Sequence, residues 1–197
     1  MSINKLKLLV SILLRKIRSA IIRASLFFST ITCRISVLGE SAISIAPGCT
    51  FGRDVLLRAT DGGSISIGSG VSLADRVQIV TTGFVSIEND VFIGVGSIIV
   101  CKQNIIIGSD SLIAEYVVIR DQDHRTDSRP VNQSGFHTKA IHIGKDVWIG
   151  CKASVLRGAS IGDRCVIGAH ALVNSHIPED MLAVGLPARV IKRIGNH

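Results

Sequence analysis

An aliphatic residue recurs every six positions through most of this 197-residue chain, and a small or branched residue follows each one four places later. The longest uninterrupted run reads IGKDVW, IGCKAS, VLRGAS, IGDRCV and IGAHAL and covers residues 143–172. Stretches with the same pattern lie earlier, at residues 45–56, 67–78, 87–98 and 107–118. A six-residue unit cannot bury its own apolar side, so such units must stack on one another to form a core.

The distance between equivalent units indicates how they stack. Ile67, Ile87 and Ile107 lie twenty residues apart, whereas the step from Ile143 to Ile161 is eighteen residues. Three units make eighteen residues, so each turn consists of three short strands, and the early turns carry two extra residues. We therefore predict an all-β fold, a parallel β-helix of triangular cross-section whose first and fifth positions point inward. Glycine after the leading aliphatic residue suits positions where stacked turns would crowd a side chain.

Small and β-branched side chains must fill this core, because aromatic residues make up only 4% of the chain. The net charge of +7 arises entirely from residues 1–34, which hold seven basic residues and no acidic residue. The remaining chain holds fifteen residues of each sign, so nothing in its charge indicates a nucleic-acid-binding face. The five cysteines include no C-x-x-C pair, and we expect Cys49 and Cys165 to be small buried residues in a reducing cytosol.

Residues 1–34 form a separate arm, which we predict to be a basic amphipathic helix. Its apolar face comprises Leu6, Val10, Leu13, Ile17, Ile21, Ala24 and Phe28. Charged residues interrupt the apolar arc too often for a membrane-spanning helix, and no signal peptide fits. The helix either lies on an anionic membrane surface or packs on the main domain or on a partner chain, and both alternatives remain open.

The repeat breaks once, at the sequence RDQDHRTD of residues 120–127. The stretch SLIAEYVVI precedes His124 in this break, and KDVWIGCKASVLRGASIGDRCVIGAHALV and HIPEDMLAVGLPARVIKRI follow it. These stretches resemble the left-handed β-helix acyltransferases built of hexapeptide repeats, and among them the galactoside and maltose, the xenobiotic and the capsular polysaccharide O-acetyltransferases. The resemblance implies a left-handed coil, a homotrimer with active sites between neighbouring subunits, acetyl-CoA as the donor and a hydroxyl group as the acceptor.

His124 is the candidate catalytic residue, because a sugar hydroxyl must lose its proton as it attacks a thioester. An imidazole has the pKa to take this proton and to pass it to the leaving thiol. We expect residues 120–140 to be an irregular loop braced by the rigid coil, which is a common setting for catalytic groups. Asp121 and Asp123 flank the histidine and are candidates to orient its ring or to bind acceptor hydroxyls. A solvated charged loop with a solvated histidine is the plainer alternative.

Trp148 occupies the sixth position of its unit, so its indole should point outward, where exposure is costly unless a partner covers it. The resemblance implies contact with the pantetheine arm of CoA, and packing between subunits is the alternative. The backbone amides of Gly150 and Cys151 are candidates to bind the thioester oxygen as it becomes negative. The resemblance also implies backbone contact of Ala169 with the pantetheine.

The other cofactor-binding candidates are expected near the phosphates of CoA. Asn174 and Ser175 replace a Thr-Lys pair that is frequent in the family, so one phosphate contact is expected to be missing. Arg189 and Lys192 match basic residues near the 3′-phosphate, with Arg193 as a substitute, and Lys152 is a further phosphate partner. For each cation the alternative is a solvated surface residue.

No metal site is expected. His137 and His142 have a spacing that could suit a metal pair, but His142 alternates with Ile141 and Ile143 and should point outward. In the galactoside branch an asparagine one coil before the histidine contributes to the acceptor site, and this chain has Gly94 at that position. This departure argues against a simple galactoside or maltose acceptor.

These features predict an acetyl-CoA-dependent O-acetyltransferase that acts on a sugar of a bacterial surface polysaccharide. We expect it in the cytoplasm, with the arm in peripheral contact with the inner face of the membrane. An amino-sugar or xenobiotic (antibiotic) acetyltransferase and a non-catalytic β-helix scaffold are the alternatives. The expected domains are the arm at 1–34, the β-helix at 35–178 with its inserted loop at 120–140, and a C-terminal segment at 179–197.

Overall fold

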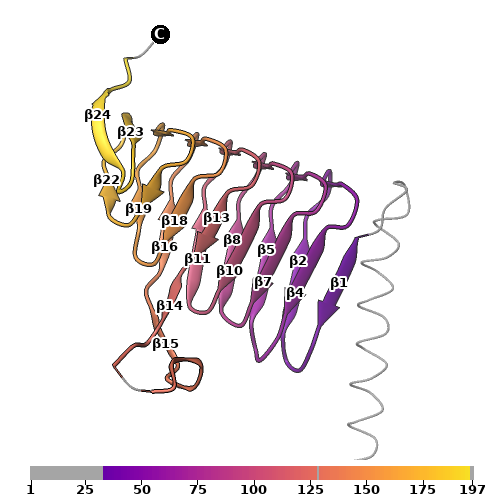
Figure 1. The fold of residues 1–197 in the computed structure, drawn as a ribbon. Helices are drawn as coiled ribbons and strands as arrows, with labels where there is room; N and C mark the ends of the chain where they lie inside the picture. The colour runs from indigo at the N-terminus through magenta and orange to yellow at the C-terminus, as the bar shows by residue number, and fades with distance from the viewer. Residues whose placement is uncertain (1–32, 128, 196–197) are drawn as a thin grey trace, which may run out of the picture. The chain divides into compact units, whose positions relative to one another are not determined.

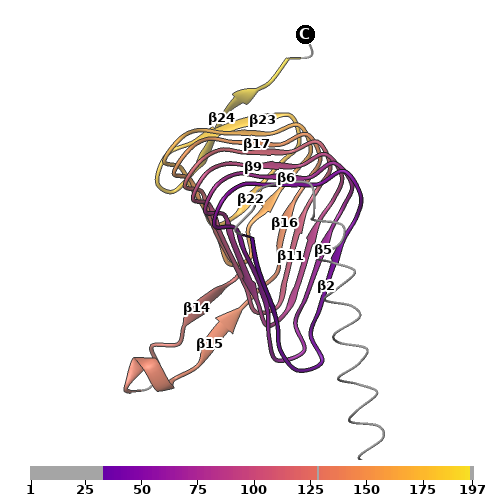
Figure 2. The ribbon, with the colours of Figure 1, turned by 90° about the vertical axis from the view of Figure 1, so that its right-hand side faces the viewer.

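The computed structural model describes residues 33–127 and 129–195, and in them three parallel sheets form the faces of a coil (Figure 1). Successive coil strands belong to sheet A, sheet B and sheet C in turn, so each turn of the chain adds one strand to every sheet. Seen along the coil, the three sheets enclose a single elongated core (Figure 2). This architecture is the predicted left-handed parallel β-helix.

The strands of each sheet follow one another in chain order. Sheet A contains β1 (Arg34–Val37), β4 (Leu56–Ala59), β7 (Gln78–Thr81), β10 (Ile98–Cys101), β13 (Val118–Arg120), β18 (Ser154–Leu156) and β21 (Leu172–Val173). Sheet B contains β2 (Ala42–Ile45), β5 (Ser64–Ile67), β8 (Phe84–Ile87), β11 (Asn104–Ile107), β16 (Ile141–Ile143), β19 (Ser160–Ile161) and β22 (His176–Ile177). Sheet C contains β3 (Thr50–Phe51), β6 (Ser72–Leu73), β9 (Phe92–Ile93), β12 (Leu112–Ile113), β17 (Trp148–Ile149), β20 (Val166–Ile167), β23 (Met181–Val184) and the antiparallel β24 (Arg189–Arg193).

The inward side chains of neighbouring turns stack in register. Ile67, Ile87 and Ile107 pair across β5, β8 and β11 and are all buried, as their spacing predicted. Fifth-position residues such as Val147 are buried as well. The stack continues past the break in the repeat, where Ile107 pairs with Ile143. Burial of these aliphatic layers supplies the main stabilisation of the coil, at about 25 cal/mol per Å² of apolar surface removed from water.

The corners between sheets require two special backbone features. In most units the fourth residue has a positive φ although it is often not glycine, as at Asp54 (57°), Asp90 (57°) and Arg164 (56°). Glycine after the leading aliphatic residue avoids a clash between stacked turns, because a Cβ on Gly150 would lie 2.6 Å from the Ala169 nitrogen of the next turn. The predicted reason for these glycines is therefore confirmed, whereas the positive φ at the fourth position was not predicted.

The segment between β13 and β16 is more regular than expected. Strand β14 (Gln122–His124) pairs antiparallel with β15 (Phe136–Thr138), and the short 3₁₀ turn η1 (Val131–Gln133) lies between them (Figure 2). The prediction of a wholly irregular loop is therefore wrong, and residues 121–140 are called the hairpin segment below. Antiparallel pairing satisfies backbone groups that an irregular loop would leave to water.

The two cysteines expected in the core differ in burial. Cys165 is buried as predicted, but Cys49 is only half-buried, with its thiol 3.1 Å from the carbonyl oxygens of Ala46 and Gly68.

The predicted amphipathic helix falls almost wholly outside the described residues, which enter sheet A with β1 at Arg34. No helix within residues 33–127 and 129–195 is long and apolar enough to cross a bilayer.

Candidate active site

Asp121 anchors the hairpin segment where it leaves the coil, at the corner between sheets A and B. Its buried carboxylate accepts hydrogen bonds from the backbone amides of Lys102 (2.8 Å), Gln103 (2.7 Å) and Asn104 (3.0 Å). One turn earlier the amides of Thr82 and Phe84 donate to carbonyls of the next turn, but here the chain has left the coil and such carbonyls are missing. The carboxylate replaces them, because buried amides need an acceptor. Asp121 therefore has a structural position, which contradicts its predicted contact with acceptor hydroxyls.

The same anchor affects a neighbouring cysteine. The Cys101 thiol lies 3.3 Å from the Asp121 carboxylate inside the corner. Burial, reinforced by this negative charge, raises the pKa of the Cys101 thiol to about 12. Cys101 is therefore a neutral, unreactive thiol near pH 7 and takes no part in nucleophilic chemistry.

His124 ends strand β14 and is held by an aromatic contact. It pairs across the hairpin with Phe136, and the two ring centroids are 4.4 Å apart with their planes tilted by 41°. The ammonium nitrogen of Lys102, from the preceding turn, lies 4.3 Å from the centroid of the same phenyl ring. The His124 side chain is exposed, and no other residue described in the structure hydrogen-bonds to its imidazole. The ring is thus held from one side while both of its nitrogens remain open to a substrate.

The Asp123 side chain is engaged in an ion pair within the chain. Its carboxylate forms a half-exposed ion pair with the Arg157 guanidinium, with 2.7 Å between Oδ2 and Nε. Arg157 belongs to the next turn of the coil, at the same corner between sheets A and B. The pair ties the hairpin to the coil, and a contact of Asp123 with the acceptor stays a prediction.

Trp148 lies on sheet C and points outward as predicted, with 53% of the residue exposed. It continues a row of exposed apolar side chains, since it pairs in register with Leu112, which pairs with Phe92. A bound pantetheine or a neighbouring subunit would cover such a row. Both predicted alternatives for the indole therefore remain open.

The corner between sheets C and A carries the candidate amides. The Gly150 amide donates to the Ile167 carbonyl at 2.7 Å, so its predicted contact with the thioester oxygen does not agree with the structure. The amides of Cys151 and Ala169, by contrast, make no hydrogen bond to any other described residue. Exposed Lys152 follows at the same corner. The corner thus offers the amides of Cys151 and Ala169 and the Lys152 ammonium to a ligand, and their predicted contacts with acetyl-CoA stay predictions.

The remaining cofactor candidates lie in two other places. Asn174 and Ser175 are exposed at the corner between sheets A and B, two turns beyond the root of the hairpin segment. Arg189 and Lys192 are exposed on β24 at the edge of sheet C. Arg193 pairs with the Asp180 carboxylate at 3.1 Å and is therefore engaged within the chain.

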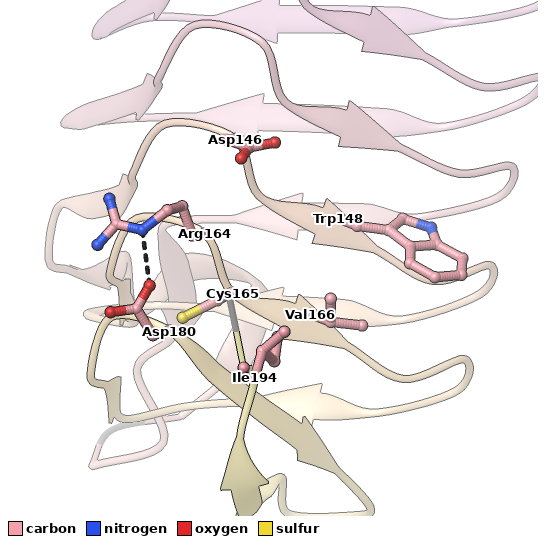
Figure 3. A pocket seen from close by; sticks show the side chains of 8 residues that line it. Asp146, Trp148, Arg164, Cys165, Val166, Asp180 and Ile194 are labelled. Carbon is pink, nitrogen blue, oxygen red and sulfur yellow. Dashed lines mark hydrogen bonds and ion pairs between the residues drawn. The ribbon is translucent and has the colours of Figure 1, made fainter. Parts of the chain in front are cut away.

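A cavity of about 280 Å³ lies beside Trp148, between sheet C and the end of β24 (Figure 3). Arg164 and Asp180 form an ion pair of 2.6 Å at its wall. Its lining residues are Asp146, Trp148, Arg164, Cys165, Val166, Asp180, Ile194 and Gly195. No residue of the hairpin segment lines this cavity, so it adjoins the Trp148 region and not His124.

The candidate base and the Trp148 region therefore lie in separate places on one chain. His124 projects with the hairpin on the side of the coil away from sheet C, and sheet C carries Trp148 on β17 (Figure 2). The free amides of Cys151 and Ala169 lie at the corner next to sheet C. One chain does not bring the candidate base and the candidate donor site together.

Sequence reasoning missed the residues that hold the hairpin: Lys102, Phe136 and Arg157. One available signal was that Phe136 is the only Phe, Tyr or Trp between residues 121 and 140. Its pairing with His124 depends on the register of the hairpin, for which the segment has no typical two-residue turn sequence.

The structure also explains the glycine at position 94. A Cβ there would lie 2.6 Å from the Ala114 carbonyl carbon and 2.6 Å from the Glu115 nitrogen, so an asparagine does not fit this corner.

In the described part of the chain no group of three or more His, Cys, Asp or Glu side chains could hold a metal ion.

Comparison with known proteins identifies related sequences. Residues 140–175 match the family described as bacterial transferase hexapeptide (six repeats), and residues 84–119 match the hexapeptide repeat of succinyl-transferase. The chain is 32% identical over 148 residues to WbbJ of Escherichia coli (strain K12), which carries the name of a lipopolysaccharide biosynthesis O-acetyl transferase. That match covers 68% of this chain and 74% of WbbJ.

A second relative is longer than this chain. Rv3034c of Mycobacterium tuberculosis (strain ATCC 25618 / H37Rv), which carries the name of an acetyltransferase, is 38% identical over 153 residues. The match covers 75% of this chain but only 51% of Rv3034c, so the chain spans about half the length of that relative. Among solved structures, the polySia specific acetyltransferase NeuO is similar with a TM-score of 0.62 and 24% identity, over 83% of this chain and 76% of NeuO. A likeness at this identity shows the common β-helix fold.

Proposed function

Because the chain belongs to the hexapeptide-repeat acetyltransferase family, we propose that it transfers an acetyl group from acetyl-CoA to a sugar hydroxyl of a bacterial surface polysaccharide. The similarity to WbbJ, whose name refers to lipopolysaccharide biosynthesis, supports a glycan acceptor. The steric need for Gly94 supports an acceptor site different from that of the galactoside branch.

His124 is the general base of this proposal, and its place on the hairpin is the observation that carries it. An imidazole nitrogen accepts the proton of the sugar hydroxyl while the hydroxyl oxygen bonds to the thioester carbon. The tetrahedral intermediate then collapses, the carbon–sulfur bond breaks, and the imidazolium returns the proton to the leaving sulfur. The products are the acetyl ester and free CoA thiol. The Phe136 contact holds the imidazole through its ring face and does not occupy its nitrogens with a hydrogen bond.

The Cys151 amide is the candidate donor to the negative oxygen of this intermediate, because it has no other partner among the described residues. The Trp148 indole packs on the pantetheine arm, and the Ala169 amide donates to it. Lys152, Arg189 and Lys192 bind the phosphates. These assignments combine the family resemblance with the exposure of each group.

We propose a homotrimer as the working form, because the hairpin and the Trp148 region point to different sides of one coil. In a cyclic trimer the His124 of one subunit faces the Trp148 region of its neighbour, so three equivalent sites form. The exposed row of Phe92, Leu112 and Trp148 borders such an interface.

Subunit mixing tests both the trimer and the site. His124→Ala and Trp148→Ala proteins are assayed separately at low acetyl-CoA, then unfolded together, refolded and assayed again. Random mixing gives roughly a quarter of the sites an intact His124 and an intact Trp148 from different subunits, so activity should rise several-fold above the mean of the two variants. No rise would place both residues in the same subunit or in unrelated roles.

An acceptor panel separates the alternative functions. Thioester cleavage is followed with hydroxyl sugars, amino sugars and aminoglycoside antibiotics, and the acetylated product is identified by mass spectrometry. Cleavage with amino compounds alone would favour an amino-sugar or xenobiotic acetyltransferase. No cleavage with any acceptor would favour a non-catalytic scaffold.

We also propose action in the cytoplasm, with the basic arm on the inner face of the membrane.

A further inference from the structure

We propose that the acceptor sugar carries a negative charge, which cations at the root of the hairpin segment bind. The inference rests on the proposed function, because it concerns the acceptor of the same site. The cations are Lys102 before the hairpin segment, Arg120 at the end of β13, and Lys139 beside β16.

The argument begins with the carboxylates of the hairpin segment, all three of which are engaged within the chain. Asp121 is buried against three backbone amides. Asp123 pairs with Arg157, and Asp127 pairs with Arg125 through a contact of 2.6 Å. No carboxylate of the hairpin segment remains to neutralise another cation.

Lys102, Arg120 and Lys139 are left without an ion pair to any residue that the structure describes. Each is at least partly exposed. The root of the hairpin therefore has a net positive charge, although the chain beyond the arm is neutral as a whole. A local excess of one sign attracts ligands of the opposite sign.

The positions of these cations relate them to the candidate base. The ammonium of Lys102 and the imidazole of His124 both lie against the same Phe136 ring, with the ammonium nitrogen 4.3 Å and the imidazole centroid 4.4 Å from its centroid. Lys139 follows β15 directly, and its backbone amide donates to the Asp121 carbonyl at 3.0 Å. Its side chain crosses the next turn where Gly158 lies, because a Cβ on Gly158 would come within 2.6 Å of the Lys139 Cδ.

The cations thus lie on the turn before His124, at the end of its own turn and against the turn after it. A sugar whose hydroxyl reaches the imidazole would present a carboxylate or phosphate group to at least one of them. Such a charge contact at an exposed site contributes about fivefold in affinity and weakens as salt rises.

The test uses the full-length protein and direct titration calorimetry, so that it does not depend on turnover. The probes are hexuronate and sialate oligosaccharides, each paired with its carboxyl-reduced derivative, and a phosphorylated oligosaccharide paired with its dephosphorylated form. Lys102→Gln removes the charge next to Phe136, and Lys102→Arg restores it. Lys145→Gln removes an exposed charge from the turn that carries His124, at the corner between sheets B and C, and serves as the matched control.

We expect at least one charged probe to bind more tightly than its neutral partner, by about fivefold or more at low salt. Lys102→Gln should remove most of this preference, while Lys102→Arg and Lys145→Gln should keep it. The carboxylate and phosphate pairs identify which anion is bound.

Equal binding of every charged probe and its neutral partner would overturn the inference, and acetylation of the neutral sugars would then leave the proposed function intact. A Lys102→Gln protein whose only defect is a higher KM for acetyl-CoA would also overturn it, since the cations would then serve the phosphates of the donor. A failure of the proposed function would appear differently, as no acetylation of any hydroxyl acceptor.

Discussion

The coil buries an aliphatic side chain at nearly every inward position, whereas nearly all side chains of the hairpin segment are exposed or half-exposed. The coil is stabilised by many similar contacts, so each one contributes a small part. The hairpin depends on a few specific contacts: the Asp121 carboxylate, the Asp123–Arg157 pair and the rings of His124 and Phe136. A single substitution in the hairpin should therefore mainly lower turnover. A single substitution on the surface of the coil should mainly change ligand binding or subunit assembly.

The largest effect is expected from His124→Ala, which removes the candidate base. Turnover should fall by roughly a hundredfold or more, the contribution of a general base, while the assembly and CoA binding stay unchanged. The control is His137→Ala, because His137 lies on the same hairpin opposite Asp123 and is also exposed. Steady-state kinetics of both variants decide the point, and activity of His124→Ala within twofold of the unaltered protein would refute the assignment.

Asp121→Ala should have the next largest effect, because it leaves three backbone amides without their charged acceptor. We expect a loss of about 3 kcal/mol in stability and a drop in turnover of roughly tenfold as the hairpin shifts. Thermal unfolding and kinetics measure the two effects. Asp127→Ala, which breaks only an exposed pair in the hairpin segment, should change neither by much. Equal effects of the two variants would show that the anchor at the root has no special role.

Trp148→Ala tests the coil side of the comparison. Loss of the indole should raise the KM for acetyl-CoA by roughly tenfold, because the exposed half of the side chain becomes apolar contact area only when the donor binds. Leu112→Ala removes a neighbour from the same exposed row and is the control for packing between subunits. A changed oligomeric state with an unchanged KM, measured by light scattering and kinetics, would mean that the indole packs between subunits.

The smallest effect on catalysis is expected from removal of residues 1–32, which keeps β1 intact. The truncated protein should acetylate soluble acceptors as before but should no longer sediment with anionic vesicles, since each basic residue near such a surface contributes about 1 kcal/mol. Binding of the full-length protein should weaken with salt without vanishing, because its apolar face is not screened. Aggregation or inactivity of the truncated protein would mean that the arm belongs to the fold.

Much of the coil was predictable because its determinants are local. The aliphatic spacing decides which side of each strand faces inward, so the stacking of Ile67, Ile87 and Ile107 and the outward direction of Trp148 followed from counting. The position of His124 in the break was also predictable, and its catalytic role stays a prediction. Which corner amides are left for a ligand was not predictable, because the Gly150 amide is engaged by a carbonyl of the next turn.

The contacts of the hairpin segment could not be derived in the same way. Asp121 and Asp123 are nearly alike in the sequence, yet one is buried against amides 17 to 19 residues earlier and the other pairs with Arg157, 34 residues later. An aspartate in a break of the repeat carries no mark of which neighbour it will meet. Its surroundings depend on where the chain leaves the stack and which amides lose their carbonyl partners there. Inward aliphatic positions follow from strand geometry and the exclusion of apolar groups from water, whereas polar contacts follow from the unsatisfied groups that folding brings together.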